Sequence, residues 1–355
     1  MVQRFLFRIL LSPLALLYGI GVSLVNLLYD TGFLRSSKFN IPVISVGNLS
    51  IGGAGKTPHI EYLLDLLSGY IYVATLSRGY KRLTRGFRYA TYSDTALTVG
   101  DEPMQYRMKY RDVIVAVSES RAYAIPQILK DSPQIQLVLL DDAFQHRAVK
   151  PGLNLLLTAY DAMFTQDFLL PAGRLREWRS SYKRADVIVV TKCPETLGVI
   201  QKNKIIREIS PLPYHRVFFT RYEYDLPYSF YDKNLGQPLN QNMEVILLSA
   251  IANTSYLMQY VDAQVGSVTQ IEFADHHLFD KGDVEKIIQV YRNSTPGQTI
   301  VLTTEKDAMR LALHQDMLEG AGIPVFVLPA KVQVLFGEGP EFNAVIHQYL
   351  LNFTM

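Results

Sequence analysis

The sequence predicts an α/β protein built around a parallel sheet that helices cover on both faces. Three observations support this prediction: short β-branched apolar runs alternate with helical segments, a glycine-rich loop follows the first run, and two adjacent carboxylates end a later one. Such runs occupy residues 41–47, 70–76, 112–117, 137–141, 153–158 and 185–191. Ligands of these sheets bind at the carboxyl ends of the strands, so the polar residues that follow the runs are the first candidates for a site.

A turn-rich stretch divides the chain near residue 220. Residues 227–242 read PYSFYDKNLGQPLNQN and are rich in turn formers. A second, smaller α/β unit follows, with strands expected at 244–250, 268–273, 299–303 and 324–328 and a helix at 281–293. We interpret it as a lid or accessory lobe. The predicted organisation is an N-terminal helix at 1–35, a core domain at 36–220, a linker at 221–243 and a C-terminal α/β lobe at 244–355.

The glycine-rich loop is the most informative stretch. Residues 44–58 read ISVGNLSIGGAGKTP, which contains the GGxGKT core of a P-loop but has Ser50 where the full pattern has glycine. In such a loop the backbone amides and the helix N-terminus bind phosphate, the lysine reaches the outer phosphates and the hydroxyl holds Mg²⁺. A glycine-rich turn with an incidental Lys-Thr is the alternative, but strand, loop and helix occur in the required order. The expected fold is therefore P-loop NTPase-like, with Gly52, Gly53, Ala54, Gly55, Lys56 and Thr57 binding ATP phosphates.

The run LVLLDDAFQHR at 137–147 resembles a Walker B strand. Such a strand brings Asp141 or Asp142 beside the P-loop, where it holds Mg²⁺ directly or through water. A strand-end aspartate that caps the next helix is the alternative. Gln145 and His146 would then lie near the phosphates and orient them.

Two further segments carry candidate acid–base residues. In VGDEPMQYR (99–107), Asp101 and Glu102 precede a helix that they can cap, or one of them can take a proton from an acceptor hydroxyl. In FADHHLF (273–279), Asp275 and His276 offer either part of a metal site or an Asp-His pair that meets Asp101 when the lobes close. TTEKDAMR (303–310) reads as a charged helix N-terminus.

Basic residues gather in two loops. LSRGYKRLTRGFR (76–88) contains Arg78 and suits phosphate or anionic lipid, or a solvated face. LLPAGRLREWR (169–179) places Arg174 and Arg176 beside an apolar patch with Trp178, as a surface for an anionic amphiphile would. Lys192 follows the apolar run of VIVVTKCPE (187–195). We expect it either to lie over the adenine of ATP or to be a chance lysine at a strand end.

The N-terminal segment is strongly apolar. Residues 5–28 carry one charge, Arg8, and the uncharged run from 9 to 28 is about long enough to cross a bilayer core. A membrane helix, a buried first helix and a signal peptide compete, although a small-x-small cleavage site is missing. We favour a membrane-associated helix that lies in the interface, because the segment is weakly apolar for a span and basic residues flank both sides.

Composition narrows the function further. The chain has 355 residues, 48% hydrophobic content and a net charge of +2, so nothing indicates a nucleic-acid binder, and no obligate protein partner is evident. The single cysteine, Cys193, excludes an internal disulfide and is typical of a reducing compartment.

Taken together, these motifs resemble a known family. GNLSIGGAGKTP, SRGY, GDEP, LDDAFQHR, LLPAGRLRE, VVTKCP, FADHH and TEKDA, in this order from about residue 41 to 310, are similar to the tetraacyldisaccharide 4′-kinases of lipid A assembly. The resemblance implies transfer of the γ-phosphoryl group of ATP, with Mg²⁺, to the 4′-hydroxyl of a tetraacylated glucosamine disaccharide 1-phosphate. It also implies an enzyme at the cytoplasmic face of the bacterial inner membrane.

The resemblance assigns roles to residues of this chain. Catalysis is expected from Asp101 as the base, His276 as its partner, Lys56 and Asp142. Metal ligands are expected among Thr57, Asp141, Asp142 and Glu102, and lipid contacts at Asn48, Arg78, Arg174 and Arg176. Many members read PAGPLREP where this chain has Arg174 and Trp178, which leaves the mode of lipid docking open.

Two other functions fit parts of the pattern. A P-loop ATPase or GTPase that drives a partner predicts steady hydrolysis without a lipid acceptor. A membrane-tethered nucleotide-binding module predicts ATP binding without turnover. The basic, aromatic loops and the apolar N-terminus favour a lipid acceptor over both.

Overall fold

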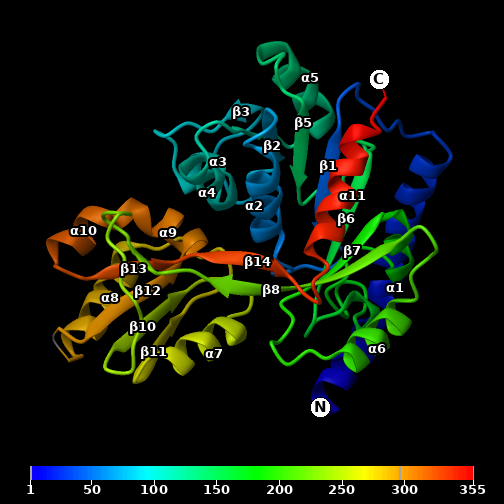
Figure 1. The fold of residues 1–355 in the computed structure, drawn as a ribbon. Coiled ribbons are helices and arrows are strands. Elements are labelled where there is room, and N and C mark those ends of the chain that lie inside the picture. Colours follow the sequence, from blue (N-terminus) through cyan, green and yellow to red (C-terminus); the bar gives the residue numbers. More distant parts are fainter. Residues whose placement is uncertain (1, 296, 355) are drawn as a thin grey trace.

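Two lobes and a long N-terminal helix make up the chain (Figure 1). The computed structural model describes residues 2–295 and 297–354, with the backbone alone for residues 2–7. A nine-stranded sheet forms the larger lobe and a five-stranded sheet the smaller one. All the strands predicted from the apolar runs are present, with ends shifted by at most three residues. The α/β fold with a parallel sheet is therefore confirmed.

The larger sheet has the order β14-β8-β7-β6-β1-β5-β2-β4-β3. Its strands run parallel except at the two edges, where β14 and β3 are antiparallel to their neighbours. β1, which leads into the glycine-rich loop, is buried along its whole length because helices cover both faces of the sheet. The strands are β1 Val43–Asn48, β2 Val73–Ser77, β3 Arg88–Tyr89, β4 Ile114–Val117, β5 Leu137–Asp141, β6 Leu153–Ala159, β7 Val187–Thr191, β8 Arg216–Tyr224 and β14 Ala330–Val334.

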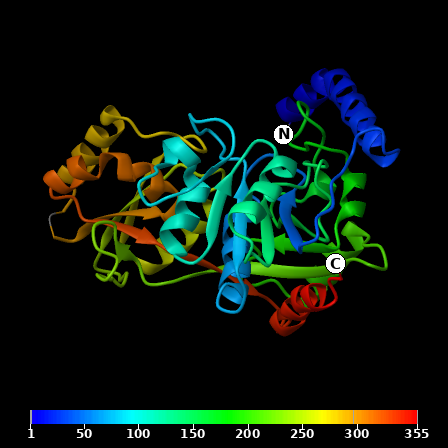
Figure 2. The same cartoon turned by 90° about the horizontal axis from the view of Figure 1, so that it is seen from above.

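Alternate residues of each strand pack against opposite helical layers, as the two-residue period of a strand requires. In β5, Leu137 and Leu139 face one layer, whereas Val138 and Leu140 face the other. The first layer contains α2 Lys56–Leu67, α4 Asp101–Lys109 and α11 Gly339–Leu351, and the second contains α5 Arg121–Asp131, α6 Val199–Ile209 and α1 Val2–Asp30. Figure 2 shows α1 and α11 on opposite sides of the larger lobe. A short helix, α3 Ala96–Val99, precedes α4.

The smaller lobe repeats this three-layer plan. Its sheet has the order β11-β10-β12-β13-β9, parallel except for β9. The α7 helix packs on one face, and α8, α9 and α10 on the other. Its elements are β9 Tyr228–Ser229, β10 Glu244–Ser249, α7 Ser255–Gln264, β11 Ser267–Glu272, α8 Lys281–Arg292, β12 Thr299–Thr304, α9 Glu305–Leu311, α10 Gln315–Gly320 and β13 Val325–Leu328.

The chain crosses between the lobes twice, which changes the expected boundaries. The larger sheet's β8 extends to Tyr224, beyond the predicted end of the core at 220, and β9 lies inside the predicted linker at 221–243. At the other end, residues 330–351 return to the larger lobe instead of completing the predicted 244–355 lobe. There β14 pairs with β8, and Phe342 of α11 packs against Phe218. Local sequence patterns do not predict this pairing, because the paired strands lie far apart in the sequence.

The α1 helix lies along the flank of the larger lobe (Figures 1 and 2). From Arg8 to Asp30 it is long and apolar enough to cross a membrane, with a mean hydropathy of 1.8 and only 11% of that stretch buried. Two basic or aromatic side chains of the lobe hold it. Trp178 contacts its middle, and Arg147 donates to the carbonyl of Asn26 and to Asp30 near its end.

Candidate active site

The glycine-rich loop joins β1 to α2 at the carboxyl edge of the larger sheet. Gly52 and Gly55 have φ of 112° and 87°, a left-handed region that favours glycine. A Cβ on Gly55 would also come within 2.5 Å of the Tyr222 hydroxyl. The α2 helix starts at Lys56, so its N-terminus and the loop amides form the phosphate-binding geometry expected from the sequence.

Lys56 belongs to a network of charges beside this loop. Its Nζ lies 3.7 Å from Oδ1 of Asp142 and donates to Oδ1 of Asn48 at 3.2 Å. Arg176 forms hydrogen bonds with the same two residues. It donates to both carboxylate oxygens of Asp142, at 2.8 and 3.1 Å, and to Oδ1 of Asn48 at 2.6 Å. Burial opposes ionisation of Asp142, but Lys56, Arg176 and Arg121 together hold its pKa well below the ordinary value.

Asp141, the neighbouring carboxylate, has a different environment. It is fully buried, and its Oδ2 accepts from the hydroxyls of Tyr106 at 3.1 Å and Ser77 at 3.4 Å. Its Oδ1 is buried without a hydrogen-bond partner among the residues that the structure describes. Burial and the nearby Glu102 raise the pKa of Asp141 to about 7, against the opposing effect of Lys56.

This unpaired oxygen indicates a place for a cation. Within residues 2–295 and 297–354, three or more His, Cys, Asp or Glu side chains do not converge into a preformed metal site. Mg²⁺ in nucleotide sites, however, takes only one or two carboxylates and completes its shell with phosphates and water. Asp141, with Glu102 close enough to raise its pKa and the buried Thr57 at the start of α2, fits that requirement.

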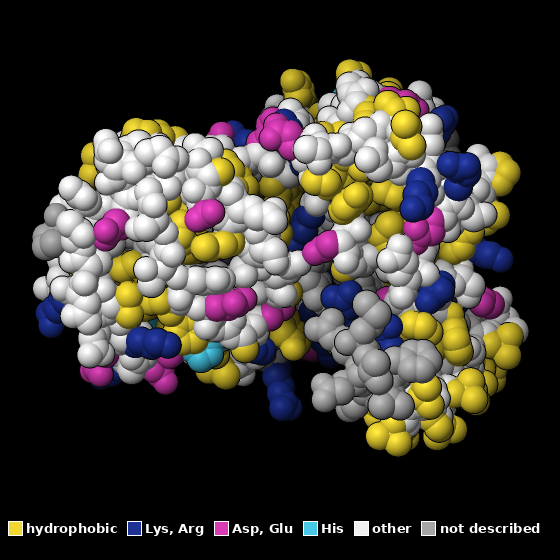
Figure 3. Space-filling model, turned by 90° about the horizontal axis from the view of Figure 1, so that it is seen from below, with side chains coloured by type: hydrophobic (Ala, Val, Ile, Leu, Met, Phe, Trp, Pro, Cys, Tyr) yellow, Lys and Arg dark blue, Asp and Glu magenta, His cyan; other side chains and the backbone are white. Residues whose placement is uncertain are grey.

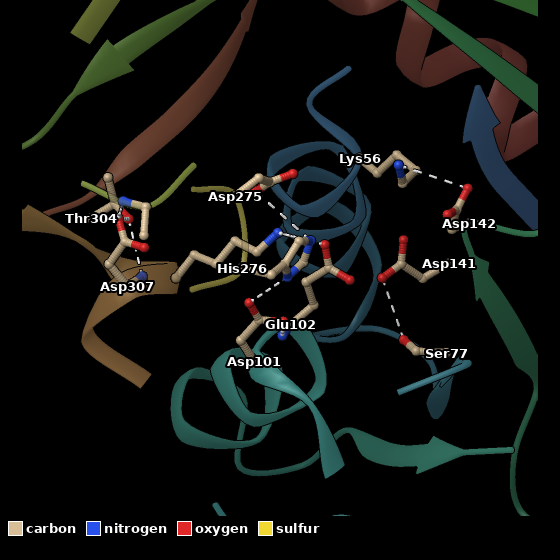
Figure 4. Close-up of polar contacts among 12 residues, drawn as sticks. Lys56, Ser77, Asp101, Glu102, Asp141, Asp142, Asp275, His276, Thr304 and Asp307 are labelled. Atoms are coloured by element: carbon tan, nitrogen blue, oxygen red, sulfur yellow. Dashed lines mark hydrogen bonds and ion pairs between the residues drawn. The ribbon is translucent and has the colours of Figure 1, made fainter. Parts of the chain in front are cut away.

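A second polar cluster joins the two lobes opposite the phosphate loop. Nδ1 of His276, from the smaller lobe, lies 2.9 Å from Oδ2 of Asp101 at the start of α4 (Figure 4). Arg310 also reaches Asp101, at 3.4 Å. Lys306 donates to Glu102 at 3.0 Å and lies 3.2 Å from Nε2 of His276.

The charges of this cluster determine which of its groups can accept a proton. Burial disfavours the Asp101 carboxylate, but Lys306, His276 and Arg310 outweigh burial and hold its pKa well below the ordinary value. Burial likewise opposes the charge of Lys306, and Glu102, Asp101 and Asp275 raise its pKa above the ordinary value. Because Lys306 remains a donor to Nε2 of His276, the ring proton lies on Nδ1 and points to Asp101.

The two lobes enclose a cleft of about 810 Å³ between these clusters. His276 lines the cleft, whereas Asp101 lies behind it and is almost fully buried. Figure 4 shows Glu102 between His276 and Asp141, with Lys56 and Asp142 beyond. The cleft walls therefore carry a cationic phosphate loop, the carboxylates of Glu102, Asp141 and Asp142, and the imidazole of His276, whose Nε2 lies 3.2 Å from the Lys306 ammonium.

One wall of the cleft is basic. Arg78, Arg121 and His146 line it together with Arg174 and Arg176. Burial, Arg121 and Arg78 lower the pKa of His146 to about 4, so it is neutral at pH 7. Arg174 is paired with Asp167 at 2.9 Å and Arg176 with Asp142, which leaves Arg78 and Arg121 as the cations best able to take an added anion.

An adjoining pocket of about 150 Å³ continues from the phosphate loop toward the smaller lobe. Its apolar and aromatic lining consists of Tyr222, Tyr224, Ile251, Tyr256, Leu257 and Leu328. Lys192 lies at its mouth with Nζ 4.3 Å from the Tyr256 ring centroid, and burial lowers its pKa to about 8. This pocket has the size and chemistry for a flat base.

Most residues expected from the sequence meet in this cleft. The structure brings together the loop from Gly52 to Thr57, Glu102, Asp141, Asp142, Gln145, His146 and His276, with Arg78, Arg174 and Arg176 on the basic wall. Asn48 does not line the cleft: it is buried, and its Oδ1 accepts from Lys56 and Arg176. Gln145 donates to the carbonyl of Asn48 at 3.0 Å. His277 instead pairs with Asp283 of its own lobe, at 2.6 Å.

Sequence reasoning missed three basic residues of the site: Lys306, Arg310 and Arg121. The sequence of TTEKDAMR (303–310) predicts Lys306 and Arg310 only as part of a charged helix N-terminus. The available signal was position, since TTEKDA follows β12 at the carboxyl edge of its sheet, where ligands bind. Arg121 starts α5 directly after β4 and offered the same signal.

Comparison with known proteins identifies the family. The model of the family described as tetraacyldisaccharide-1-P 4′-kinase matches residues 7–351. A protein named tetraacyldisaccharide 4′-kinase from Flavobacterium johnsoniae is 43% identical over 345 residues, 97% of this chain and 98% of that protein. Another of that name, from Bacteroides fragilis strain YCH46, is 40% identical over 351 residues, with 97% and 93% covered.

A solved structure agrees with both. LpxK from Aquifex aeolicus, described as the "apo" form in complex with ATP, superposes with a TM-score of 0.72 at 29% identity and covers 97% of this chain and 99% of that one. The fold, the cleft and the sequence matches lead to one assignment: this chain belongs to the tetraacyldisaccharide-1-P 4′-kinase family.

Proposed function

We propose that this chain transfers the γ-phosphoryl group of ATP to the 4′-hydroxyl of a tetraacylated glucosamine disaccharide 1-phosphate, within the cleft between its lobes. The product is the 1,4′-bisphosphate. The observation that supports this proposal best is the His276–Asp101 pair, which faces a phosphate-binding loop across the cleft and is assembled from both lobes. The cleft wall lined with arginines supports the proposal as well, since guanidinium groups can bind the phosphate of an anionic lipid acceptor.

The nucleotide is proposed to lie along the phosphate loop. Its base fits the aromatic pocket that Tyr222 and Tyr256 line, and Lys192 lies between that pocket and the loop. Lys56 and the amides of the loop neutralise the phosphates. Mg²⁺ would be held by Asp141, Thr57 and Glu102, with Asp142 beside them, and would neutralise charge between the β- and γ-phosphates.

The proton of the acceptor hydroxyl is proposed to pass to Nε2 of His276, once the hydroxyl has displaced the Lys306 ammonium from that nitrogen. The sequence predicts Asp101 as the base, but Lys306, Arg310 and the Nδ1–H of His276 make its carboxylate a weak proton acceptor, and it lies behind the imidazole. In this arrangement Asp101 fixes the tautomer of His276 and stabilises the imidazolium as it forms. The hydroxyl oxygen then attacks the γ-phosphorus as the bond to the ADP oxygen breaks.

The acceptor's 1-phosphate is proposed to bind the basic wall. Among the described residues, Arg78 and Arg121 form no salt bridge, although Arg121 lies close enough to Asp142 to lower its pKa, and Arg174 is half exposed beside them. Guanidinium groups suit this role because they bind phosphate oxygens in pairs.

The acyl chains are proposed to remain in a bilayer that α1 contacts. Ile9, Leu10, Leu14, Leu17 and Leu24 are each more than half exposed on this helix. Figure 3 shows hydrophobic side chains gathered near the N-terminal end of α1, with basic side chains beside them. Because Trp178 and Arg147 hold α1 along the flank of the lobe from its middle to its end, we favour a helix that lies in the membrane interface. Because ATP is available in the cytoplasm, the protein is proposed to act at the cytoplasmic face of the inner membrane.

A labelled-phosphate assay tests the proposal. Full-length protein is incubated with γ-labelled ATP, Mg²⁺ and tetraacyl disaccharide 1-phosphate in mixed micelles, and chromatography separates lipid from free phosphate. We expect labelled lipid that depends on His276. Label found only in free phosphate, at a rate independent of lipid, would favour the ATPase instead.

The membrane role has its own test. Deletion of residues 1–28 should lower both membrane pelleting and activity on lipid. Unchanged pelleting of the truncated protein would exclude α1 as the membrane contact.

A further inference from the structure

One stripe of α1 contacts the larger lobe. Its members recur every three or four residues and are less exposed than their neighbours: Leu11, Ala15, Gly19, Val22 and Asn26. At the centre of the stripe Trp178, the single tryptophan of the chain, lies against Gly19. Its Nε1 donates to the carbonyl of Gly19 at 3.1 Å and to Oγ of Ser23 at 2.9 Å. A Cβ on Gly19 would overlap the indole ring, so the contact requires a helix without a side chain there.

The segment that carries Trp178 also contacts the phosphate loop. The Tyr18 hydroxyl of α1 donates to the carbonyl of Arg176 at 2.9 Å. The amide of Arg176 donates to the carbonyl of Leu49 at 2.7 Å, and the amide of Ile51 donates to the carbonyl of Arg174 at 2.8 Å. Residues 174–176 therefore run alongside the residues that lead from β1 into the glycine-rich loop.

The side chain of Arg176 completes the path into the site. It is bonded to both oxygens of Asp142 and to Oδ1 of Asn48, and the same Asn48 oxygen accepts from Lys56. Three hydrogen bonds, through Arg176 and Asn48, thus connect α1 to the lysine of the phosphate loop.

We infer that Trp178 is a positioning residue that couples the bilayer-bound helix α1 to the phosphate-binding residues through Arg176. The inference rests on the proposed function, because it takes the bilayer as the surface that α1 contacts. With Trp178 bonded to α1, docking of the helix fixes Arg176, and Arg176 fixes Asn48 and Asp142 around Lys56. Without that contact, the helix still binds the bilayer but no longer holds Arg176 in place.

Two glycines of α1 allow a matched test. Gly19→Ala places a methyl group in the indole ring, whereas Gly21→Ala, two residues away on the exposed side, meets no described atom within 4 Å. Both substitutions raise helix propensity equally. Trp178→Phe is the third variant, because it keeps an aromatic ring but removes the N–H donor. Each full-length protein is tested on phosphatidylethanolamine–phosphatidylglycerol vesicles that contain the tetraacyl disaccharide 1-phosphate.

We expect wild-type protein and both alanine variants to float equally with vesicles. The kcat of Gly19→Ala should fall about tenfold, since a displacement of about 1 Å in a positioning contact can cost up to about 100-fold. The KM for the lipid acceptor should stay within about twofold. Gly21→Ala should retain the wild-type kcat, and Trp178→Phe should lose about fivefold, the effect of one net hydrogen bond. Gly19→Ala and Trp178→Phe combined should lose less than the product of both, because they break the same contact.

Tryptophan emission supplies an independent readout, since it reports on Trp178 alone. It should shift to longer wavelength in Gly19→Ala but not in Gly21→Ala. Equal kcat values for the two alanine variants, on vesicles that bind both, would overturn the inference. So would a loss of vesicle binding in Gly19→Ala that matches its loss of activity, because the contact would then only hold the helix. Wild-type protein that neither floats nor labels lipid would overturn the proposed function itself.

Discussion

Replacing Lys306 with methionine should disable the site while leaving the fold intact. Methionine keeps most of the aliphatic stem but removes the ammonium group that bonds Glu102 at 3.0 Å and Nε2 of His276 at 3.2 Å. The bond to Glu102 crosses between the lobes, whereas the contact with His276 lies within the smaller lobe, so the loss of both affects the closure of the cleft and the tautomer of His276. The carboxylate of Glu102 is left without its cation.

The size of the effect follows from burial. Breaking a fully buried ion pair costs about 3–5 kcal/mol. The side chains of Lys306 and Glu102 keep 18% and 16% of their exposure, so solvent recovers part of that cost. We therefore expect a loss of about 2 kcal/mol, which corresponds to about 30-fold in kcat/KM.

The assay is transfer of labelled phosphate to the lipid acceptor, with the free energy of unfolding measured in urea. Lys331→Met is the matched control: its partner Asp225 lies at 2.5 Å, but the two side chains are 59% and 48% exposed, so the variant should stay within about twofold of wild type. Equal kcat/KM values for the two variants would refute the role of Lys306. A loss of activity that merely follows the unfolded fraction of Lys306→Met would refute it as well.

Three further predictions follow from local geometry. Gly55→Ala should lower ATP affinity at least tenfold and destabilise the fold by about 1–2 kcal/mol, because Gly55 has a positive φ and lies against Tyr222. Gly69→Ala is the control, since a Cβ at Gly69 meets no described atom within 4 Å, and it should change neither quantity. Calorimetric titration with ATP and denaturation in urea compare the two variants. Asp141→Asn should stabilise the protein without ligands by about 1 kcal/mol, since burial already raises the pKa of Asp141 to about 7. Mg²⁺-dependent phosphoryl transfer should fall at least 100-fold in the same variant. Unchanged activity would exclude Asp141 as a ligand of Mg²⁺. Burial, with Glu305 beside it, raises the pKa of Glu61 from 4.5 to about 7, so the stability that protonated Glu61 contributes is complete below pH 4.5 and is lost as the pH rises through about 7. Glu61→Gln should therefore flatten the pH dependence of the free energy of unfolding in urea over this range by about 2 kcal/mol. Parallel curves for the variant and the wild type would contradict the assignment.

The sequence predicted the local parts of this structure well. The apolar runs located every parallel strand of the two sheets except β8, because strands buried on both faces have few alternatives, but they did not locate the antiparallel strands β3, β9 and β14. The glycine-rich loop located Lys56 and Thr57 at the start of α2, since strand, glycine-rich loop and helix occur in the order of a phosphate-binding loop. Strand-end position alone located Asp141 and Asp142.

What the sequence did not predict depends on contacts between distant segments. The pairing of β14 with β8, which returns residues 330–351 to the larger lobe, joins segments more than 100 residues apart. The exchange of roles that we propose for Asp101 and His276 rests on Lys306 and Arg310, whose charges act on Asp101 from the other lobe. Charges at a helix start look the same in sequence whether they cap that helix or cross to a neighbouring lobe.

The central claim is that the lobes together form a kinase site in which His276 accepts the proton. The most direct test compares transfer of γ-labelled phosphate to the tetraacyl disaccharide 1-phosphate by wild type, His276→Gln and Asp101→Asn, with ATP binding measured alongside. The account predicts labelled lipid from wild type, a loss of at least about 100-fold in His276→Gln and a smaller loss in Asp101→Asn, with ATP binding retained in all three. Labelled lipid formed by His276→Gln at the wild-type rate would contradict it.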